Sequence, residues 1–495
     1  MKSSLPEHAR HLMKLDHPLR SRAGRRAIGL GFAALALVGC ASRPVNPPLT
    51  RYEPAPYQFQ RADRDPTNAE NLVILAFSGG GTRAAAFSYG VLEALRRIEV
   101  EGPRGRRERL LDEVDAITGV SGGSFTALAY ALYGEKLFDE YEKRFLKRNV
   151  QGELIARFFN PAYWSAMSAD GRGRSDVASE LYDEILFNGA TFDDLRKIGG
   201  PVTFVSATDI ESGSRVVFSR VNFDVLCADL GAIRISRAAA ASSAVPVVLS
   251  PITINNYGGT CGYKEPDWVN VFADTKDPPR PAARILQRLA ELRAFDSGHD
   301  PYLHLVDGGV SDNVGLRGVL DLITAFESLH EAGLPTPLDR VKRIVVFVVN
   351  SLSTPATNWN EVEAAPGTIP ILIKATGVPI DRYSGESVEL LKDIAARWKA
   401  LRQIRDSVAF TKAKDATVRY VEHAPNAELY AIDVSFPALK DKAERAYLNQ
   451  LPTSFVLPDE AVDRLRAAAF KIILDSPDFQ RMLKEAGARI VPPTP

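Results

Sequence analysis

A serine in a glycine-rich segment is the first feature of this sequence that could do chemistry. Ser121 stands in Gly119-Val120-Ser121-Gly122-Gly123, which has the Gly-x-Ser-x-Gly spacing of a nucleophile elbow. In such an elbow, a strained turn between a strand and a helix projects the hydroxyl outward, and small neighbours keep other chains clear of it. The next amide and the helix N-terminus lie close to any developing negative charge. The pattern therefore predicts a nucleophilic serine.

Three consecutive glycines, Gly79 to Gly81, precede Thr82 and Arg83 and form a second candidate. Glycines let the backbone turn sharply and bring successive N–H groups into one concave surface. A helix start adds partial positive charge there, so the loop can hold a phosphate or a developing oxyanion. Gly79-x-Gly81-x-x-Ala84 also fits the loose dinucleotide-binding pattern, which leaves a dinucleotide-binding protein as an alternative.

An aspartate at the end of an apolar run is the third candidate. Asp307 follows Leu303-His304-Leu305-Val306 and precedes Gly308-Gly309. Active sites in open α/β sheets gather at the carboxyl ends of the strands, which is where this residue is expected. Taken alone, the segment is better explained as an ordinary Asp-Gly turn.

In this order, the three segments resemble the patatin-like lipid acyl hydrolase family. The family signature is a Gly-Gly-Gly-x-Arg/Lys loop, a Gly-x-Ser-x-Gly elbow and an Asp-Gly-Gly or Asp-Gly-Ala turn, and residues 239–246 also look like the family. The resemblance covers about residues 72–350, with Ala84 standing where many bacterial members have Gly. It implies a serine hydrolase that cleaves carboxylic esters in lipids, above all glycerophospholipids, and needs neither a metal nor an organic cofactor.

The resemblance also implies a role for each candidate. Ser121 would be the nucleophile that forms an acyl-enzyme, and Asp307 would be the general base of a Ser–Asp dyad without histidine. Arg83 would brace the glycine loop rather than touch the substrate. The oxyanion-hole amides would come from Gly79, Gly80 and Gly81.

A histidine triad is the competing enzyme interpretation. In α/β-hydrolase order it would need His330 or His423 after Asp307. His330 falls in a helical pattern and His423 lies outside any glycine-flanked strand end, so we expect both at the surface. A catalytically silent envelope protein that binds lipid or partners is the other alternative, and the presence of every expected catalytic residue type argues against it.

The elements that must position these residues alternate in type. Apolar runs predict strands at 72–77, 113–118, 201–206, 214–219, 302–306 and 343–349, and helical patterns predict helices at 82–98 and 122–133. This alternation indicates an α/β fold with a mostly parallel central sheet flanked by helices, and the resemblance adds a three-layer, hydrolase-related arrangement. We expect a catalytic core over residues 69–350, with 256–301 as an insertion.

Residues 351–495 are expected to form a helix-rich C-terminal extension. A charged helical pattern covers 387–407, candidate strands occur at 418–421 and 429–434, and helix-like sequence runs over 458–486 with a break at Ser476-Pro477. The strand signals favour an extension that packs on the core.

The N-terminal segment resembles a bacterial lipoprotein signal. Seven basic side chains precede an uncharged run over 27–38 that is too short to span a bilayer, and this run ends in Leu37-Val38-Gly39-Cys40. The resemblance implies removal of residues 1–39, lipidation of Cys40 and anchoring in a bacterial cell envelope, on the periplasmic side or at the outer membrane. The Pro-rich residues 40–68 would form a tether between lipid and body.

The overall composition is that of a globular protein. Of 495 residues, 45% are hydrophobic and 25% are charged, which excludes a disordered chain and a multi-span membrane protein. The 61 basic and 61 acidic side chains balance, so no global attraction draws the chain to nucleic acid. Neither a CxxC pair nor an HExxH motif occurs, so no structural zinc site is expected. Composition does not determine the oligomeric state.

Two cysteines remain if Cys40 is acylated. Export would place Cys227 and Cys261 in an oxidising compartment, where they could form a disulfide. Two free, buried thiols are the slightly favoured expectation.

Residues 157–167 carry five bulky apolar or aromatic side chains across a proline. We expect this segment to pack in the core. If exposed, it would suit a lipid interface or an acyl groove.

Overall fold

The computed structural model describes residues 43–54, 70–102, 105, 107–167, 172–266, 269, 280–295, 300–357, 359–407 and 421–492. The predicted signal segment and Cys40 lie outside this part of the chain. Within the described ranges, no helix is both long enough and apolar enough to cross a membrane.

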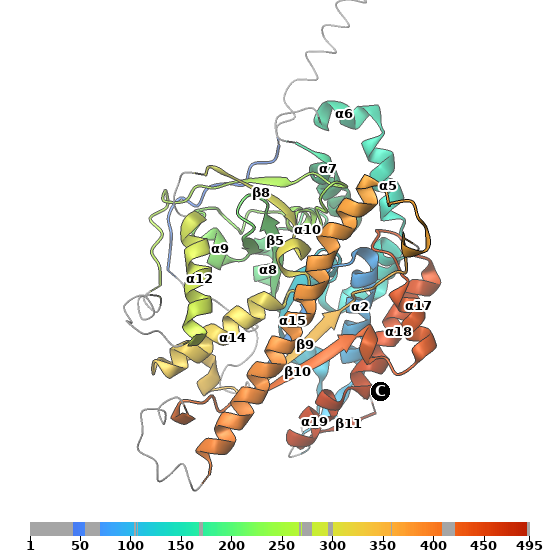
Figure 1. Cartoon of the computed structure of the whole chain (residues 1–495). Coiled ribbons are helices and arrows are strands. Elements are labelled where there is room, and N and C mark those ends of the chain that lie inside the picture. Colours follow the sequence, from blue (N-terminus) through green and yellow to red (C-terminus); the bar gives the residue numbers. More distant parts are fainter. Residues whose placement is uncertain are drawn as a thin grey trace, which may run out of the picture.

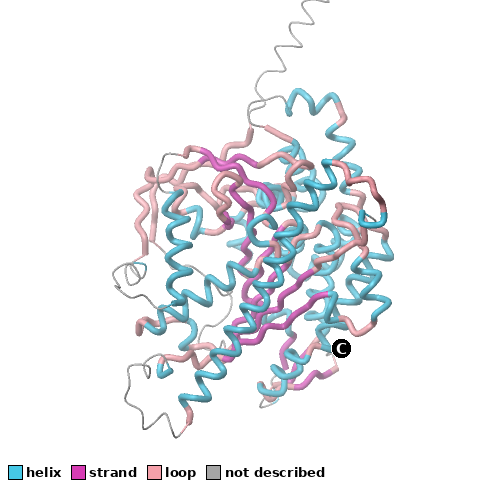
Figure 2. Tube along the Cα trace, viewed as in Figure 1, coloured by secondary structure: helices cyan, strands magenta, loops and turns pink. Residues whose placement is uncertain are grey.

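An eight-stranded sheet forms the centre of the molecule (Figures 1 and 2). The strand order is β10-β9-β1-β4-β5-β8-β7, and β6 pairs with β5 outside this path. Five neighbouring strands are parallel: β10 (Glu428–Ser435), β9 (Arg343–Asn350), β1 (Asn71–Phe77), β4 (Val114–Val120) and β5 (Val202–Asp209). Three are antiparallel to their partners: β6 (Arg215–Phe218), β8 (Tyr302–Asp307) and β7 (Ile252–Asn255). The predicted fold class, a mostly parallel sheet flanked by helices, is confirmed.

Helices cover both faces of the sheet, which explains why β1 and β9 are apolar on both of their faces. Successive side chains of a strand point to opposite faces, and β1 accordingly divides between two cores. Leu75 and Phe77 belong to one core, and Ile74 and Ala76 belong to the other. The first core lies against α2 (Gly81–Arg97), α3 (Gly122–Tyr133), α10 (Ile235–Ser242) and α18 (Asp459–Asp475). The second lies against α14 (Leu316–Glu331) and α15 (Thr368–Arg405).

The remaining helices are short, with the exception of α12. They are α4 (Leu137–Tyr141), α5 (Val150–Phe158), α6 (Pro161–Met167), α7 (Arg174–Tyr182), α8 (Phe192–Ile198), α9 (Arg220–Phe223), α12 (Arg280–Phe295), α13 (Gly309–Asp312), α17 (Lys442–Asn449) and α19 (Pro477–Glu485). A small antiparallel sheet joins β11 (Arg489–Val491), β2 (Glu99–Glu101) and β3 (Arg107–Arg109).

The C-terminal region contributes to the central sheet. Strand β10 lies beside β9, and α18 packs on α2, where Arg466 donates two hydrogen bonds of 2.8 Å to Glu93. Helix α15 begins at Thr368, earlier than the pattern at 387–407 indicates, and it continues through Pro379 without ending there. The candidate strand at 418–421 has only Val421 in the described residues, where it starts a helical turn.

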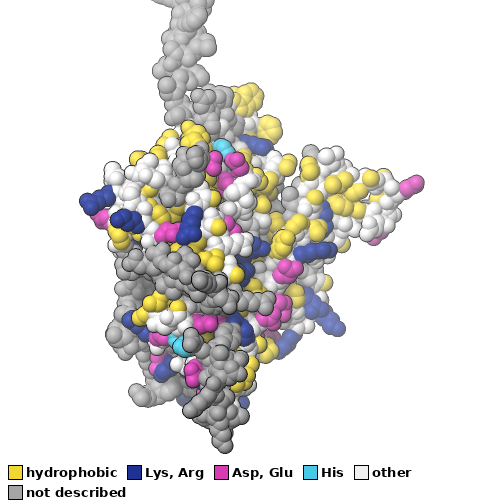
Figure 3. Space-filling view, turned by 60° about the vertical axis from the view of Figure 1, so that its left-hand side comes forward, with side chains coloured by type: hydrophobic (Ala, Val, Ile, Leu, Met, Phe, Trp, Pro, Cys, Tyr) yellow, Lys and Arg dark blue, Asp and Glu magenta, His cyan; other side chains and the backbone are white. Residues whose placement is uncertain are grey.

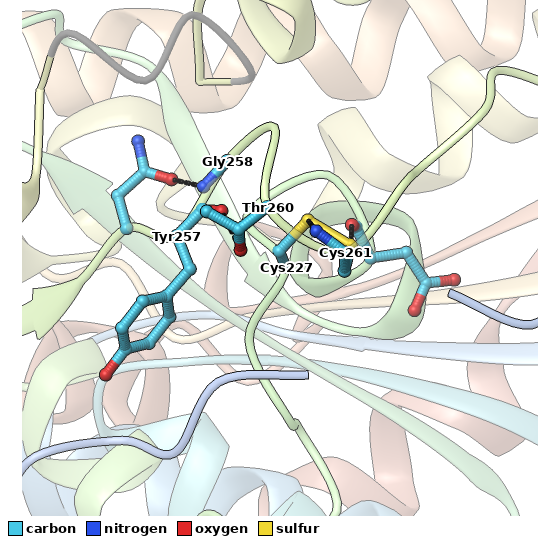
Figure 4. The surroundings of a disulfide bond; sticks show 7 residues. Cys227, Tyr257, Gly258, Thr260 and Cys261 are labelled. Carbon is cyan, nitrogen blue, oxygen red and sulfur yellow. Dashed lines mark hydrogen bonds between the residues drawn. A yellow bond between two sulfur atoms is a disulfide. The ribbon is translucent and has the colours of Figure 1, made fainter. Parts of the chain in front are cut away.

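Cys227 and Cys261 form a disulfide, which corrects the expectation of free thiols (Figure 4). Their Cα atoms lie 5.4 Å apart because the chain after β7 folds back on the loop after α9, where the Tyr257 N–H donates to the Leu226 carbonyl. Residues 43–54 run beside this disulfide. The Leu49 N–H donates to the Cys227 carbonyl, and the Tyr52 N–H donates to the Cys261 carbonyl.

Candidate active site

Ser121 occupies a strained turn between β4 and α3. Its φ of 47° and ψ of −121° place a non-glycine residue in a sparsely populated backbone region. The neighbouring positions have no room for a side chain. A Cβ at Gly122 would lie 2.0 Å from the Gly81 carbonyl oxygen, and one at Gly123 would lie 2.6 Å from the Ser78 carbonyl oxygen. The glycines of the predicted elbow therefore allow the serine turn and the Gly79–Gly81 loop to touch.

The strained turn is held by a serine that the sequence did not single out. The Ser121 N–H donates a 2.8 Å hydrogen bond to Ser242 Oγ at the end of α10. On the other side, the Ser121 carbonyl accepts hydrogen bonds from the N–H and the hydroxyl of Ser124. Ser242 lies in the 239–246 stretch noted above, and that stretch was the only signal for it.

Asp307 lies beside Ser121 at the end of β8. The aspartate is buried, and burial raises its pKa to about 6, while hydrogen bonds from the Gly309 amide and the Ser121 hydroxyl act to lower this pKa. The Gly309 N–H lies 2.7 Å from Asp307 Oδ1. The Asp307 backbone is fixed by the Ala244 carbonyl and by the Thr208 hydroxyl. The structure thus brings two of the predicted residues into contact.

The glycine loop passes directly over this pair. A Cβ at Gly79 would lie 3.2 Å from the Cβ of Ser121 and 2.5 Å from Asn313 Oδ1. The Gly79 N–H donates to the Asn313 carbonyl at 2.8 Å, so this one of the three predicted amides is already paired. Gly80 and Gly81 have positive φ values of 138° and 61°. No acceptor from the described residues pairs with either of their N–H groups.

Arg83 ties the glycine loop to the C-terminal region. The buried guanidinium donates to the carbonyls of Ser351 and Leu451 and to the hydroxyl of Thr453, at 2.7 to 3.0 Å. Burial lowers the pKa of Arg83 to about 10, and the charge of Asp381 acts to raise it. All three acceptors lie outside the predicted core, so the loop depends on residues 351–495 for its support.

Both histidines of the competing triad lie far from Ser121. His330 is 14 residues after the start of α14 at Leu316, which is about 21 Å along the helix, and its Nδ1 lies 2.8 Å from Asp339. His423 precedes the amino end of β10. Ser121 directly follows β4, and the register of the parallel strands places the end of β4 beside the carboxyl ends of β1, β9 and β10. An eight-residue strand separates these two ends by about 25 Å. Neither histidine can reach the serine in this arrangement.

The apolar segment at 157–167 is exposed in part, which corrects the expectation of core packing for Phe159 and Trp164, whereas Phe158 packs against the first core. Phe159 is 74% exposed and Trp164 is 54% exposed, because α6 projects from the body at the top of Figure 1. Val247, Val248, Ile371 and Leu372 are also exposed. The N-terminal end of α15, which carries the last two, lies at the same end of the molecule as α5 (Figure 1). In the space-filling view, hydrophobic side chains gather on a projecting lobe of the surface (Figure 3).

Three comparisons relate this site to known proteins. Residues 75–320 match the family model described as patatin-like phospholipase. No curated protein sequence matches the chain. Among solved structures, human GIVD cytosolic phospholipase A2 with methyl γ-linolenyl fluorophosphonate has a TM-score of 0.40 and 12% identity, over 84% of this chain and 59% of that chain. The human enzyme without the inhibitor has a TM-score of 0.40 and 14% identity, over 85% and 60% of the two chains. This chain therefore spans about three fifths of the length of those structures.

Proposed function

From the membership of residues 75–320 in the patatin-like phospholipase family, we propose that the chain is a serine lipid acyl hydrolase. Its substrates are the carboxylic esters of phospholipids or related acyl lipids. The observation that carries this proposal is the placement of Ser121, on a strained turn with a φ of 47°, beside the buried carboxylate of Asp307.

The proposed reaction proceeds through an acyl-enzyme. Asp307 accepts the hydroxyl proton as Ser121 Oγ attacks the ester carbonyl carbon, and it returns this proton to the leaving alcohol when the tetrahedral intermediate collapses. In the second half, Asp307 takes a proton from water, the resulting hydroxide attacks the acyl carbon, and Ser121 Oγ recovers the proton. A base with a pKa of about 6 suits this role, because it is ionised at neutral pH yet still accepts a proton readily.

The amides around Ser121 suit a developing oxyanion. The N–H groups of Gly80 and Gly81, together with that of Gly122 at the start of α3, are the proposed donors. Fixed donors in a site that excludes water stabilise such a charge without reorganising. The assignment leaves Gly79 out, since its N–H already donates to Asn313.

A fluorophosphonate probe tests the nucleophile. We expect the full chain to be labelled covalently and to hydrolyse phosphatidylcholine vesicles, and we expect Ser121→Ala to lose both properties. Ser328→Ala is the matched control, because this buried serine lies on α14 and donates only to the Thr324 carbonyl of its own helix. Labelling that persists in Ser121→Ala would overturn the assignment.

Lipidation of Cys40 and attachment to a bacterial cell envelope form a second part of the proposal. The basic segment, the short apolar run and Leu37-Val38-Gly39-Cys40 support it. The exposed apolar side chains of α5, α6 and α15 are compatible with work at a lipid surface. Metabolic labelling with an alkyne analogue of palmitate in a bacterial host tests it: label should enter the wild-type chain and be absent from Cys40→Ser.

A further inference from the structure

An apolar cavity lies on the opposite face of the sheet from α2 and α3. It measures about 260 Å³ and is walled by Ile74, Ala116 and Phe204 of the sheet and by Leu289, Val319 and Phe326 of the helices. Helices α12 and α14, which lie side by side at the left of Figure 1, supply these last three residues. Neither Ser121 nor Asp307 lines it. Protein interiors leave few voids larger than a water molecule, and this one approaches the roughly 300 Å³ of the smaller ligand sites.

One polar side chain in the cavity wall has an atom without a hydrogen-bond partner in the described residues. Asn222, which is 1% exposed, lines the cavity. Its Oδ1 accepts a 3.3 Å hydrogen bond from Arg288 Nη2. Its Nδ2 is buried and has no hydrogen-bond partner in the described residues. A buried amide donor is rarely left unpaired in a folded protein, so this atom points to an acceptor that the described residues do not supply.

The charges at this wall favour an anion. Among the described residues, the charged side chains that line the cavity are two cations, Arg215 and Arg288, and one carboxylate, Asp321. Arg215 pairs with Asp321, and Arg288 Nη1 lies 2.9 Å from Glu291. Burial, and then the charge of Arg215, lower the pKa of Arg288 to about 10. An added negative charge beside these two cations would be stabilised.

We propose that this cavity binds the anion of a long-chain fatty acid. The carboxylate accepts hydrogen bonds from Asn222 Nδ2 and from the guanidinium of Arg288, and the hydrocarbon chain lies between the sheet and helices α12 and α14. A carboxylate matches the planar donor fork of an arginine, and most of the remaining side chains that line the cavity in the described residues are apolar. A fatty acid is also a product of the proposed hydrolysis, but binding in this cavity does not depend on that reaction.

Fluorescence titration with parinaric acid, a long-chain polyene fatty acid, tests the proposal. The full chain with Ser121→Ala is used, so that turnover plays no part. We expect one molecule to bind per chain, and Arg288→Gln to weaken this binding by about tenfold or more, because a charge-assisted hydrogen bond is lost. Arg284→Gln is the matched control, since Arg284 approaches the same Asp321 at 3.7 Å but does not line the cavity.

Two further experiments locate the binding site and test whether the carboxylate of the fatty acid is recognised. Ala325→Phe, which fills the cavity from α14, should abolish binding, with thermal unfolding used to verify that the variant folds. The fatty alcohol of equal length should bind more weakly than the acid, and Arg288→Gln should leave its affinity unchanged. The proposal is overturned if no probe binds, if Ala325→Phe binds normally, or if acid and alcohol bind equally. It is also overturned if a long-chain fluorophosphonate on Ser121 of the wild-type chain displaces the probe, because binding would then lie in the catalytic site.

Discussion

Ser242 Oγ accepts a 2.8 Å hydrogen bond from the backbone N–H of Ser121, across 121 residues of chain. This contact joins the end of α10 to the turn on which Ser121 has a φ of 47°. A buried N–H that makes no hydrogen bond within a helix or strand needs another acceptor. The hydroxyl of Ser242 thereby holds the backbone of the proposed nucleophile in place.

Ser242→Ala should therefore lower kcat by about tenfold or more, while KM for a soluble ester changes little, because one positioning hydrogen bond is lost. Ser243→Ala provides the control, since the Ser243 hydroxyl donates to the Ala239 carbonyl within its own helix. Steady-state kinetics on both variants decides the matter. Equal losses in the two variants would mean that the effect is general loosening of α10.

The activity should rise with pH and reach a plateau above the pKa of Asp307. A general base works only when ionised, and this pKa is about 6, so kcat/KM should fall about tenfold for each unit below that value. A soluble short-chain ester assayed between pH 4.5 and 8 by product chromatography gives the profile. A flat profile over this range would contradict Asp307 as the base.

Asp307→Asn should inactivate the enzyme and yet stabilise the fold above pH 6. The folded pKa of about 6 is higher than the roughly 3.9 of an unfolded aspartate. The carboxyl group therefore favours folding only while protonated, and this contribution is lost as the pH rises through the folded pKa. A shift of about two pKa units corresponds to roughly 3 kcal/mol as an upper value. Urea unfolding at pH 8 should show the gain, and unfolding near pH 4 should show little; a less stable variant at pH 8 contradicts the expectation.

Phe159 and Trp164 should matter for lipid surfaces and not for the chemistry. Changing both to Ser removes apolar area that can enter a lipid interface. We expect at least a fivefold loss of the hydrolysis rate on phospholipid vesicles, with an unchanged rate on a soluble short-chain ester. Ile490→Ser is the control, because Ile490 is 42% exposed on β11, at the other end of the molecule from α6 (Figure 1). An equal loss on both substrates would place the two residues in the catalytic machinery or in folding.

Loss of the Cys227–Cys261 disulfide should lower the free energy of unfolding. The bond closes a loop with a sequence separation of 34 residues, and closing a loop of this length in the unfolded chain is worth roughly 4 kcal/mol in the chain-entropy model. The double variant Cys227→Ser/Cys261→Ser should unfold at lower temperature than the wild type in calorimetry. Dithiothreitol should lower the Tm of the wild type and leave that of the double variant unchanged.

Local sequence patterns were sufficient to predict the main elements of the core. Runs such as 72–77 and 343–349 are apolar without alternation, and this predicts strands buried on both faces, as β1 and β9 are. The pattern at 214–219 also predicts β6 correctly, but nothing local indicates that β6 runs antiparallel to β5. The direction of a strand and its neighbours in the sheet depend on how the intervening chain crosses the sheet. No single segment of sequence encodes this crossing.

The sequence by itself determined the candidate chemistry of this protein, and the tertiary structure decided the partners of each group. Ser121, Asp307 and the glycines at 79–81 are visible as motifs, because a strained turn and a close backbone approach restrict the residue types at each position. Only the fold places Asp307 beside Ser121 and excludes His330, pairs the Gly79 amide with Asn313, and joins Cys227 to Cys261. These contacts link residues far apart in the chain, and such contacts depend on sheet order and helix packing, which local patterns do not specify.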